Sequence, residues 1–342
     1  MAYQPHIVAA PNEFKLPWQP HVGISDVKFG PEGARHLVAV TGWDGSVYVY
    51  DVQSSTDPKQ KMFYFHGRPA LNCAFAGSSK LVSAGVDRTV KVADIATSKT
   101  ENLGTHDLGV RCVRYSDKLG LIASGGWDNQ IKVWDPRSPG AGAAQQGSCS
   151  DRVYAMDIRG DQIIVGTRDR KIYLFDMRNM QEPVQTRDSP LKFQTRTVAF
   201  FPSDDAFVVS SIEGRVAVEY INQSADEQAR KYAFKCHRQK DANGIELIYP
   251  VNAVAFHPTY SSFATGGSDA QVNIWDPYNR KRLVQFHTQP TSIVGLDFNV
   301  DGSQIAIASS YAYEQETDPN PIPPSSITIR ALTDGDCRIK SV

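Results

Sequence analysis

Side chains alternate in character with a period of two in many short segments along the chain. The pattern is clear in residues 46–50, 131–134 and 272–275, where valine and isoleucine recur at every second position. Such alternation is typical of β-strands with two different faces. No stretch of helical periodicity competes with it. The pattern therefore predicts an all-β protein built from many short strands.

Acidic residues recur at the turns between these strands. The first steps in the series measure 41 to 44 residues, and most members are followed seven positions later by a second Asp. This interval is that of one four-stranded propeller blade. The last step, from Glu213 to Asp269, grows to 56 residues and indicates an insertion of roughly a dozen residues. The series consists of Asp44, Asp87, Asp128, Asp169, Glu213 and Asp269.

The repeats predict a single seven-bladed propeller. Its last unit has only three strands, and residues 12–16 have no other partner, so we expect them to supply the fourth and close the ring. We expect an N-terminal tail at 1–11, the propeller at 12–335 and a C-terminal tail at 336–342. The seven units begin near Ile24, Ala70, Gly109, Val153, Thr197, Val251 and Ile293.

Composition narrows the class of function. The formal net charge is −1, which gives no indication of bulk binding to nucleic acid. The five cysteines are scattered, without a CxxC pair, and are typical of reduced thiols in an intracellular protein. Neither a signal peptide nor a membrane span is evident, so we expect a location in the cytosol or the nucleus.

The dipeptides Trp134-Asp135 and Trp275-Asp276 resemble the signature of the WD-repeat family. In that family, a set such as His106, Ser124, Asp128 and Trp134 forms a buried structural tetrad. The same residues could be taken for a catalytic Ser-His-Asp triad. However, His66, Ser83 and Asp87 repeat the first three at similar offsets, which favours the structural role. His237 is interpreted as the histidine of a further tetrad with Thr265, Asp269 and Trp275.

No other pattern indicates catalysis. The eight histidines show no HExxH-type spacing, so no metal site is predicted. The Gly-Gly pairs precede hairpin turns rather than helices and do not form phosphate-binding loops. A hydrolytic propeller would show converging acids or a metal set at its central channel. We therefore expect a protein without enzymatic activity or cofactor.

A group of cations gives the strongest indication of binding. They are expected on neighbouring blades of a nearly neutral protein, where guanidinium and ammonium groups can receive carboxylates or a phosphate. Any one of them could equally be a solvated rim charge. The group consists of Arg196, Arg215, Lys231, Lys235, Arg238 and Lys240.

The segment 211–256, together with 263–269 and 306–311, is similar to the Bub (budding uninhibited by benzimidazole) group of WD-repeat proteins of the spindle assembly checkpoint. The resemblance implies a nuclear, cytoplasmic and kinetochore-associated adaptor. Such an adaptor binds a short peptide of checkpoint kinases and related pseudokinase-type proteins. It also recognises phosphothreonine in Met-Glu-Leu-Thr repeats of a kinetochore scaffold protein. The expected form is a monomeric propeller in hetero-complexes, without direct contact to nucleic acid or membrane.

The resemblance also assigns residues. Arg215 and Lys235 match phosphate-contacting positions, and Trp43 matches an aromatic residue that packs on the same phosphopeptide. Arg196 and Arg238 match cations that meet glutamates of the kinase peptide. Trp43 and Trp127 each precede a turn Asp, so either could simply cap its blade.

The alternative is an mRNA-export propeller of the nuclear pore, which shares the Phe-Lys-Cys-His-Arg element at 234–238 and binds nucleoporin peptides. Residues 216–220 and 273–277 favour the checkpoint group.

Overall fold

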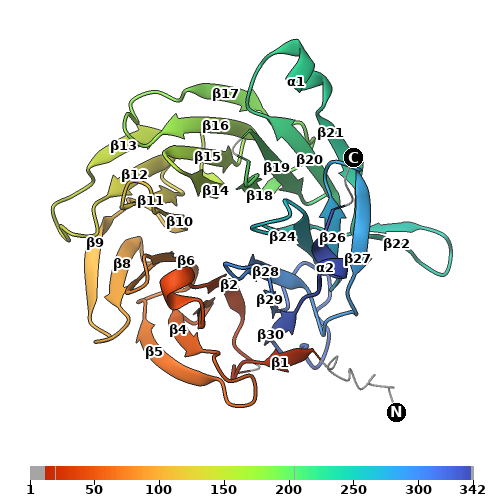
Figure 1. Cartoon of the computed structure of the whole chain (residues 1–342), viewed down its shortest axis with the longest axis horizontal. Coiled ribbons are helices and arrows are strands. Elements are labelled where there is room, and N and C mark those ends of the chain that lie inside the picture. The colour runs from red at the N-terminus through yellow and green to blue at the C-terminus, as the bar shows by residue number, and fades with distance from the viewer. Residues whose placement is uncertain (1–11, 20, 204, 340–342) are drawn as a thin grey trace.

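The first strand of each repeat lies at the centre of the molecule, and the later strands follow it outwards (Figure 1). The computed structural model describes residues 12–19, 21–203 and 205–339. Seven four-stranded antiparallel sheets surround a common axis. This confirms the predicted seven-bladed, all-β propeller.

Each blade uses a meander in which neighbouring strands pair in chain order, apart from the closing strand of the last blade. From the axis outwards, the blades are: one, β2 (Ile24–Phe29), β3 (Leu37–Gly42), β4 (Ser46–Asp51) and β5 (Lys59–Phe65); two, β6 (Ala70–Ala76), β7 (Lys80–Gly85), β8 (Thr89–Asp94) and β9 (Thr100–Thr105); three, β10 (Val110–Ser116), β11 (Leu121–Gly126), β12 (Gln130–Trp134) and β13 (Gln145–Ser148); four, β14 (Val153–Arg159), β15 (Gln162–Thr167), β16 (Lys171–Asp176) and β17 (Gln185–Asp188); five, β18 (Thr195–Phe200), β19 (Ala206–Ser211), β20 (Arg215–Tyr220) and β21 (Tyr232–Lys235); six, β24 (Val251–Phe256), β25 (Phe263–Gly267), β26 (Val272–Asp276) and β27 (Lys281–Gln285); seven, β28 (Ile293–Phe298), β29 (Gln304–Ser309), β30 (Ser326–Ala331) and β1 (Glu13–Lys15).

The N-terminal strand closes the ring. β1 pairs antiparallel with β30, with Glu13 opposite Arg330, so the predicted closing strand is confirmed. The Glu13 side chain is 2% exposed, and its carboxylate accepts a hydrogen bond of 2.6 Å from the Arg330 guanidinium. The chain ends of the domain are thus joined through main-chain pairing and a buried ion pair. The predicted tail at 1–11 lies outside the described residues.

The long step between Glu213 and Asp269 contains a separate hairpin. Its strands, β22 (Arg238–Lys240) and β23 (Glu246–Ile248), form a two-stranded sheet that projects from the rim between blades five and six (Figure 1). Three short helical segments complete the described chain: η1 (Glu32–Ala34), α1 (Ala225–Ala229) and α2 (Asp334–Cys337). No helix of the described residues is long and apolar enough to cross a membrane.

The short helix α2 belongs to the packed part of the molecule. Cys337 is 1% exposed and lies in the apolar cluster between blades six and seven, with Phe286 and Phe298. The expected boundary between propeller and C-terminal tail, at 335/336, falls inside this helix.

The core is divided among the junctions between blades. Seven apolar clusters are present, and each joins residues of two neighbouring blades. Polar bonds near the axis add to four of the junctions, because a side-chain oxygen on one innermost strand accepts a main-chain N–H of another blade. These bonds join Phe29 to Asp297 (2.8 Å), Cys73 to Asp26 (3.3 Å), Val113 to Asn72 (2.8 Å) and Phe200 to Asp157 (2.9 Å).

Candidate functional site

A β-bulge occurs at the same place in the innermost strand of every blade. In blade five, Thr195 and Thr197 pair with consecutive residues of β19, so Arg196 is left without a strand partner. A bulge redirects the side chain of its extra residue. The seven bulged residues are Ser25, Leu71, Arg111, Tyr154, Arg196, Asn252 and Val294.

Six of these residues meet at one end of the central channel. There they line a cavity of about 700 Å³ together with Trp43 and Trp127. Arg111 and Arg196 are the cations in this lining. The cavity therefore combines aromatic surface with guanidinium groups, which is a composition suited to an acidic peptide segment.

Both tryptophans at the channel mouth lie close to a glycine that precedes an innermost strand. A Cβ on Gly23 would lie 3.1 Å from the Trp43 ring, and one on Gly109 would lie 2.7 Å from the Trp127 ring. Trp43 is nevertheless 54% exposed to solvent. Each ring thus packs over its own blade and also lines the cavity.

The loop between β29 and β30 forms one wall of the cavity. It contributes Tyr311, Tyr313, Glu314, Ile322 and Pro323 to the lining. The Glu314 carboxylate forms an ion pair with the guanidinium of Arg196 in blade five. It also accepts a hydrogen bond of 2.5 Å from Ser268 Oγ in blade six. The loop is therefore fixed to two other blades through one carboxylate.

Arg215 and Lys235 lie directly opposite each other on β20 and β21. The expectation that they stand on neighbouring blades is wrong, because residues 221–231 return the chain to the outer edge of the same blade. Like charges in this relation repel. The nearest carboxylate to Arg215 is that of Glu213, at 3.8 Å, and Lys235 is exposed. The pair thus presents two closely placed cations on the surface of blade five.

Arg238 is held more firmly than the other cations. Its guanidinium donates to Glu246 (2.7 Å) and to the carbonyl oxygens of Glu213 (2.8 Å) and Gly214 (3.3 Å). Its side chain is 12% exposed. Arg196 and Arg238, assigned to one peptide by the resemblance, thus each have a glutamate partner within the chain.

The structure groups the candidates differently from the sequence. Trp43 shares the cavity at the channel mouth with Arg196, whereas Arg215 and Lys235 are not in its lining. Arg111 and Glu314 also belong to the cavity, and neither was predicted from the sequence. Arg111 is the second residue of β10, as Arg196 is of β18, so the two arginines occupy equivalent positions in their blades.

The tetrad of blade three forms a continuous chain of hydrogen bonds. Trp134 Nε1 donates to Ser124 Oγ (2.7 Å), which lies 2.8 Å from His106 Nε2. His106 Nδ1 lies 2.9 Å from Asp128. Because an ionised carboxylate only accepts, Nδ1 carries the hydrogen and Nε2 accepts from the serine. Ser124 is completely buried, so its hydroxyl is closed to a substrate.

The carboxylate of this tetrad is stabilised in its charged form. Burial opposes its ionisation, but hydrogen bonds from His106 and from the main-chain N–H groups of Asp107 and Gln130 outweigh burial and lower the pKa of Asp128. Similar interactions with His66 and Thr89 lower the pKa of Asp87 in blade two.

Two other blades contain related chains. In blade six, His237 contacts Asp269 and Thr265, both at 2.8 Å, and Trp275 Nε1 donates to Thr265 at 2.8 Å. In blade two, His66 contacts Asp87 (2.9 Å) and Ser83 (2.8 Å). The recurrence in three blades supports a structural role.

Blade two lacks the tryptophan of its tetrad. Ala93 stands at that position, and the hydroxyl of Tyr64 lies 2.7 Å from Ser83 Oγ in place of the indole N–H. For the tetrad of blade three, the residue that corresponds to Tyr64 is Gly104 on β9 of blade two, beside the Trp134 ring. Each serine thus has one aromatic hydrogen-bond partner, which comes from β5 of the preceding blade for Ser83 and from β12 of the same blade for Ser124.

The described residues contain no group of three or more His, Cys, Asp or Glu side chains that could hold a metal ion. All five cysteines are free, and burial raises the pKa of the Cys149 thiol to about 12. Burial likewise raises the pKa of Cys73, Cys112, Cys236 and Cys337. These thiols are therefore poor nucleophiles.

The WD domain, G-beta repeat family matches residues 13–51, 97–135 and 247–276. The mitotic checkpoint protein bub-3 of Caenorhabditis elegans is 56% identical over 98% of both chains. The mRNA export factor GLE2 of Chaetomium thermophilum is 33% identical over 96% of this chain and 92% of its own.

Among solved structures, that of U3-55K superposes with a TM-score of 0.78, covering 94% of this chain and 99% of its own. Its sequence is 13% identical, so this likeness concerns the propeller fold alone.

Proposed function

The chain belongs to the Bub3 family of WD-repeat proteins, and from this membership we propose that it is a non-enzymatic adaptor of the spindle assembly checkpoint. It acts in the nucleus, at kinetochores and in the cytoplasm. It joins two kinds of protein: a checkpoint kinase or related pseudokinase, through a short acidic peptide, and a kinetochore scaffold, through phosphorylated Met-Glu-Leu-Thr repeats.

The observation that carries the phosphopeptide part is the opposition of Arg215 and Lys235 across β20 and β21. Two cations in this relation repel each other in the free protein. A phosphothreonine carries about −1.5 to −2 charges and would relieve this repulsion while accepting hydrogen bonds from both side chains. The unphosphorylated threonine offers no such compensation.

The second part rests on the cavity at the channel mouth. Arg196 holds the Glu314 carboxylate there, which illustrates how a glutamate of another chain can be received. Trp43 offers an exposed aromatic surface beside it. Arg238 lies on β22, next to the rim, and provides a further guanidinium for an acidic segment that crosses blades five and six.

Titration calorimetry with a matched pair of Met-Glu-Leu-Thr peptides tests the phosphopeptide site. We expect the phosphorylated peptide to bind much more tightly than the unphosphorylated one. We also expect its affinity to fall as the salt concentration rises. Each charge-assisted hydrogen bond contributes about 1.5–3 kcal/mol, so Arg215→Ala should weaken binding by roughly tenfold or more. Arg35→Ala, an exposed cation on blade one, is the control and should leave the affinity unchanged. Equal affinity for both peptides would refute the proposal.

Charge reversal of Arg196 and Arg238 tests the kinase peptide. The doubly reversed protein should lose the checkpoint kinase in a pull-down while it still unfolds in one cooperative transition. The thermal midpoint should be lower than that of the wild type, because Arg238 loses its bonds to Glu246 and to two main-chain carbonyls. The relative that acts in mRNA export suggests the competing function. Recovery of nucleoporins instead of checkpoint kinases with the unaltered protein would favour that function.

A further inference from the structure

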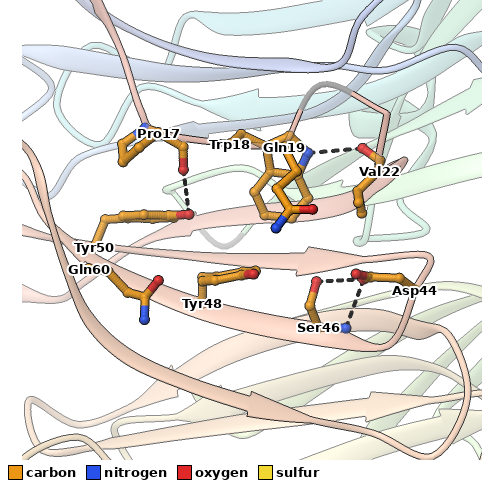
Figure 2. Close-up of a pocket in the computed structure, with 9 residues that line it drawn as sticks. All are labelled: Pro17, Trp18, Gln19, Val22, Asp44, Ser46, Tyr48, Tyr50 and Gln60. Atoms are coloured by element: carbon orange, nitrogen blue, oxygen red, sulfur yellow. Dashed lines mark hydrogen bonds between the residues drawn. The ribbon is translucent and has the colours of Figure 1, made fainter.

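A second cavity lies beside β4 of blade one and shares no lining residue with the cavity at the channel mouth. It has a volume of about 290 Å³ and is bounded by the segment that follows β1 and by one face of β4. Figure 2 shows Tyr48 and Tyr50 side by side on this face, with Trp18 above them and Asp44 at the end of the row. Neither the tetrads nor the proposed peptide sites use these residues.

The aromatic walls of this cavity are set in place by hydrogen bonds. The Tyr50 hydroxyl donates to the carbonyl of Pro17 (2.6 Å), and Trp18 Nε1 donates to the carbonyl of Val22 (2.9 Å). The Trp18 and Tyr48 rings meet at 73° with centroids 5.4 Å apart, so they form a corner. Faces of tryptophan and tyrosine rings attract cations. The corner is thus rigid before any ligand arrives.

A carboxylate adds a charge to the aromatic corner. Asp44 Oδ1 accepts hydrogen bonds from the N–H (2.9 Å) and hydroxyl (2.5 Å) of Ser46, which fixes the orientation of the group. Within the described part of the chain, Oδ2 has no hydrogen bond and Asp44 has no ion pair. Burial, and after it the charge of Asp44, raises the pKa of Tyr48. The Asp44 carboxylate therefore lies close enough to the Tyr48 hydroxyl to act on it, and both residues line the cavity.

We propose that this cavity binds the methylated ammonium group of a lysine side chain on a partner protein, with a preference for the dimethyl form. An alkylated cation is attracted to the rings of Trp18 and Tyr48, and the remaining N–H of dimethyllysine donates to Asp44 Oδ2. Trimethyllysine has no N–H for the carboxylate. Unmodified lysine is a strongly hydrated cation, so it loses more hydration free energy than a methylated lysine when it leaves water. An anionic ligand is disfavoured by the carboxylate.

The probe is Nα-acetyl-Nε,Nε-dimethyllysine methylamide, titrated into the full chain while the indole N–H signals are followed by NMR. The chain has five tryptophans, and Trp18→Leu identifies the signal of Trp18. We expect that signal to shift saturably, with weaker binding of the trimethylated and unmethylated probes. Choline serves as a further trimethylammonium compound and should also bind more weakly than the dimethyl probe.

Two substitutions separate the contributions of charge and ring. Asp44→Asn keeps an oxygen for Ser46 but removes the charge, and should weaken dimethyllysine binding by about five- to tenfold and abolish its advantage over trimethyllysine. Trp18→Leu should weaken all methylated probes by about two- to fivefold. Because this variant lacks the Trp18 indole signal, its binding is followed through the methyl signals of the probe. Asp57→Asn, an exposed carboxylate outside the cavity, is the matched control. Thermal midpoints establish that each variant is folded.

The proposal is overturned if no probe shifts the Trp18 signal saturably. It is also overturned if Asp44→Asn binds dimethyllysine as tightly as the wild type does. Tighter binding of choline than of dimethyllysine would contradict the role of the carboxylate as hydrogen-bond acceptor.

Discussion

Gly104 makes room for the indole ring of Trp134: a Cβ at this glycine would lie 2.2 Å from the ring. The N–H of the Trp134 ring donates to Ser124. The tetrad of blade three is therefore complete only because position 104 on β9 has no side chain. The same strand position in blade one, Tyr64, carries a ring that reaches the serine of blade two.

We therefore expect Gly104→Ala to destabilise the protein by overpacking, by about 1–3 kcal/mol. Urea unfolding followed by circular dichroism measures the change. Gly67→Ala is the control, because a Cβ at Gly67 meets nothing within 4 Å. Equal midpoints for Gly104→Ala and the wild type would show that the Trp134 ring can move without cost.

Acid should reduce the stability of the propeller through the tetrad carboxylates. The pKa of Asp128 is lowered in the folded protein, so the unfolded chain binds more protons as the pH falls below about 4, the ordinary value of Asp. Stability is therefore present above that value and is lost as the pH falls towards the lowered pKa. In urea unfolding between pH 6 and pH 3, Asp128→Asn should be less stable than the wild type at pH 6. The two should converge on acidification, and parallel curves would contradict this.

The closing strand should contribute to the stability of the whole ring. Glu13→Gln leaves Arg330 without its buried countercharge, and removal of one partner of a buried ion pair costs about 3–5 kcal/mol. Because the glutamine oxygen can still accept a hydrogen bond, we expect a loss at the lower end of this range. Differential scanning calorimetry should show one transition at a lower temperature. Lys15→Gln, an exposed position on the same strand, should leave the transition in place.

Glu314 should compete with an acidic peptide for Arg196. Glu314→Gln removes the negative charge but keeps the loop similar in size, and an exposed ion pair contributes up to about 1 kcal/mol. We therefore expect the kinase peptide to bind about two- to fivefold more tightly to this variant, measured by fluorescence anisotropy. Glu316→Gln, in the same loop, is the control. Weaker binding to Glu314→Gln would mean that the glutamate holds Arg196 in the orientation that the peptide requires.

The repeat made most of the fold predictable. The regular spacing of Asp44, Asp87 and Asp128 reflects a turn that every blade must make, and the unpaired strand near Phe14 left only one place for the closing strand. The grouping of the cations was less accessible. The register of β20 against β21 depends on the long connection at 221–231, which has no turn signal to set the pairing of Arg215 with Lys235.

The channel mouth was equally hard to predict, because the bulge in each innermost strand leaves no mark in the alternation of residue types. Only the structure shows that Arg196 points away from the sheet of its blade, towards a loop of blade seven. Glu314 lies 118 residues further along the chain than Arg196, so no local pattern connects the two.

The bulged residue of each blade is unusual in that it has no partner residue in the strand beside it. Serine, leucine, arginine, tyrosine, asparagine and valine all occur at this position in a single ring. The bulge therefore accepts polar, charged and apolar side chains, and at Ser25 and Asn252 the side chain also forms hydrogen bonds to neighbouring residues. In a propeller of this kind, the combination of side chains at these fixed positions determines what the channel mouth can recognise.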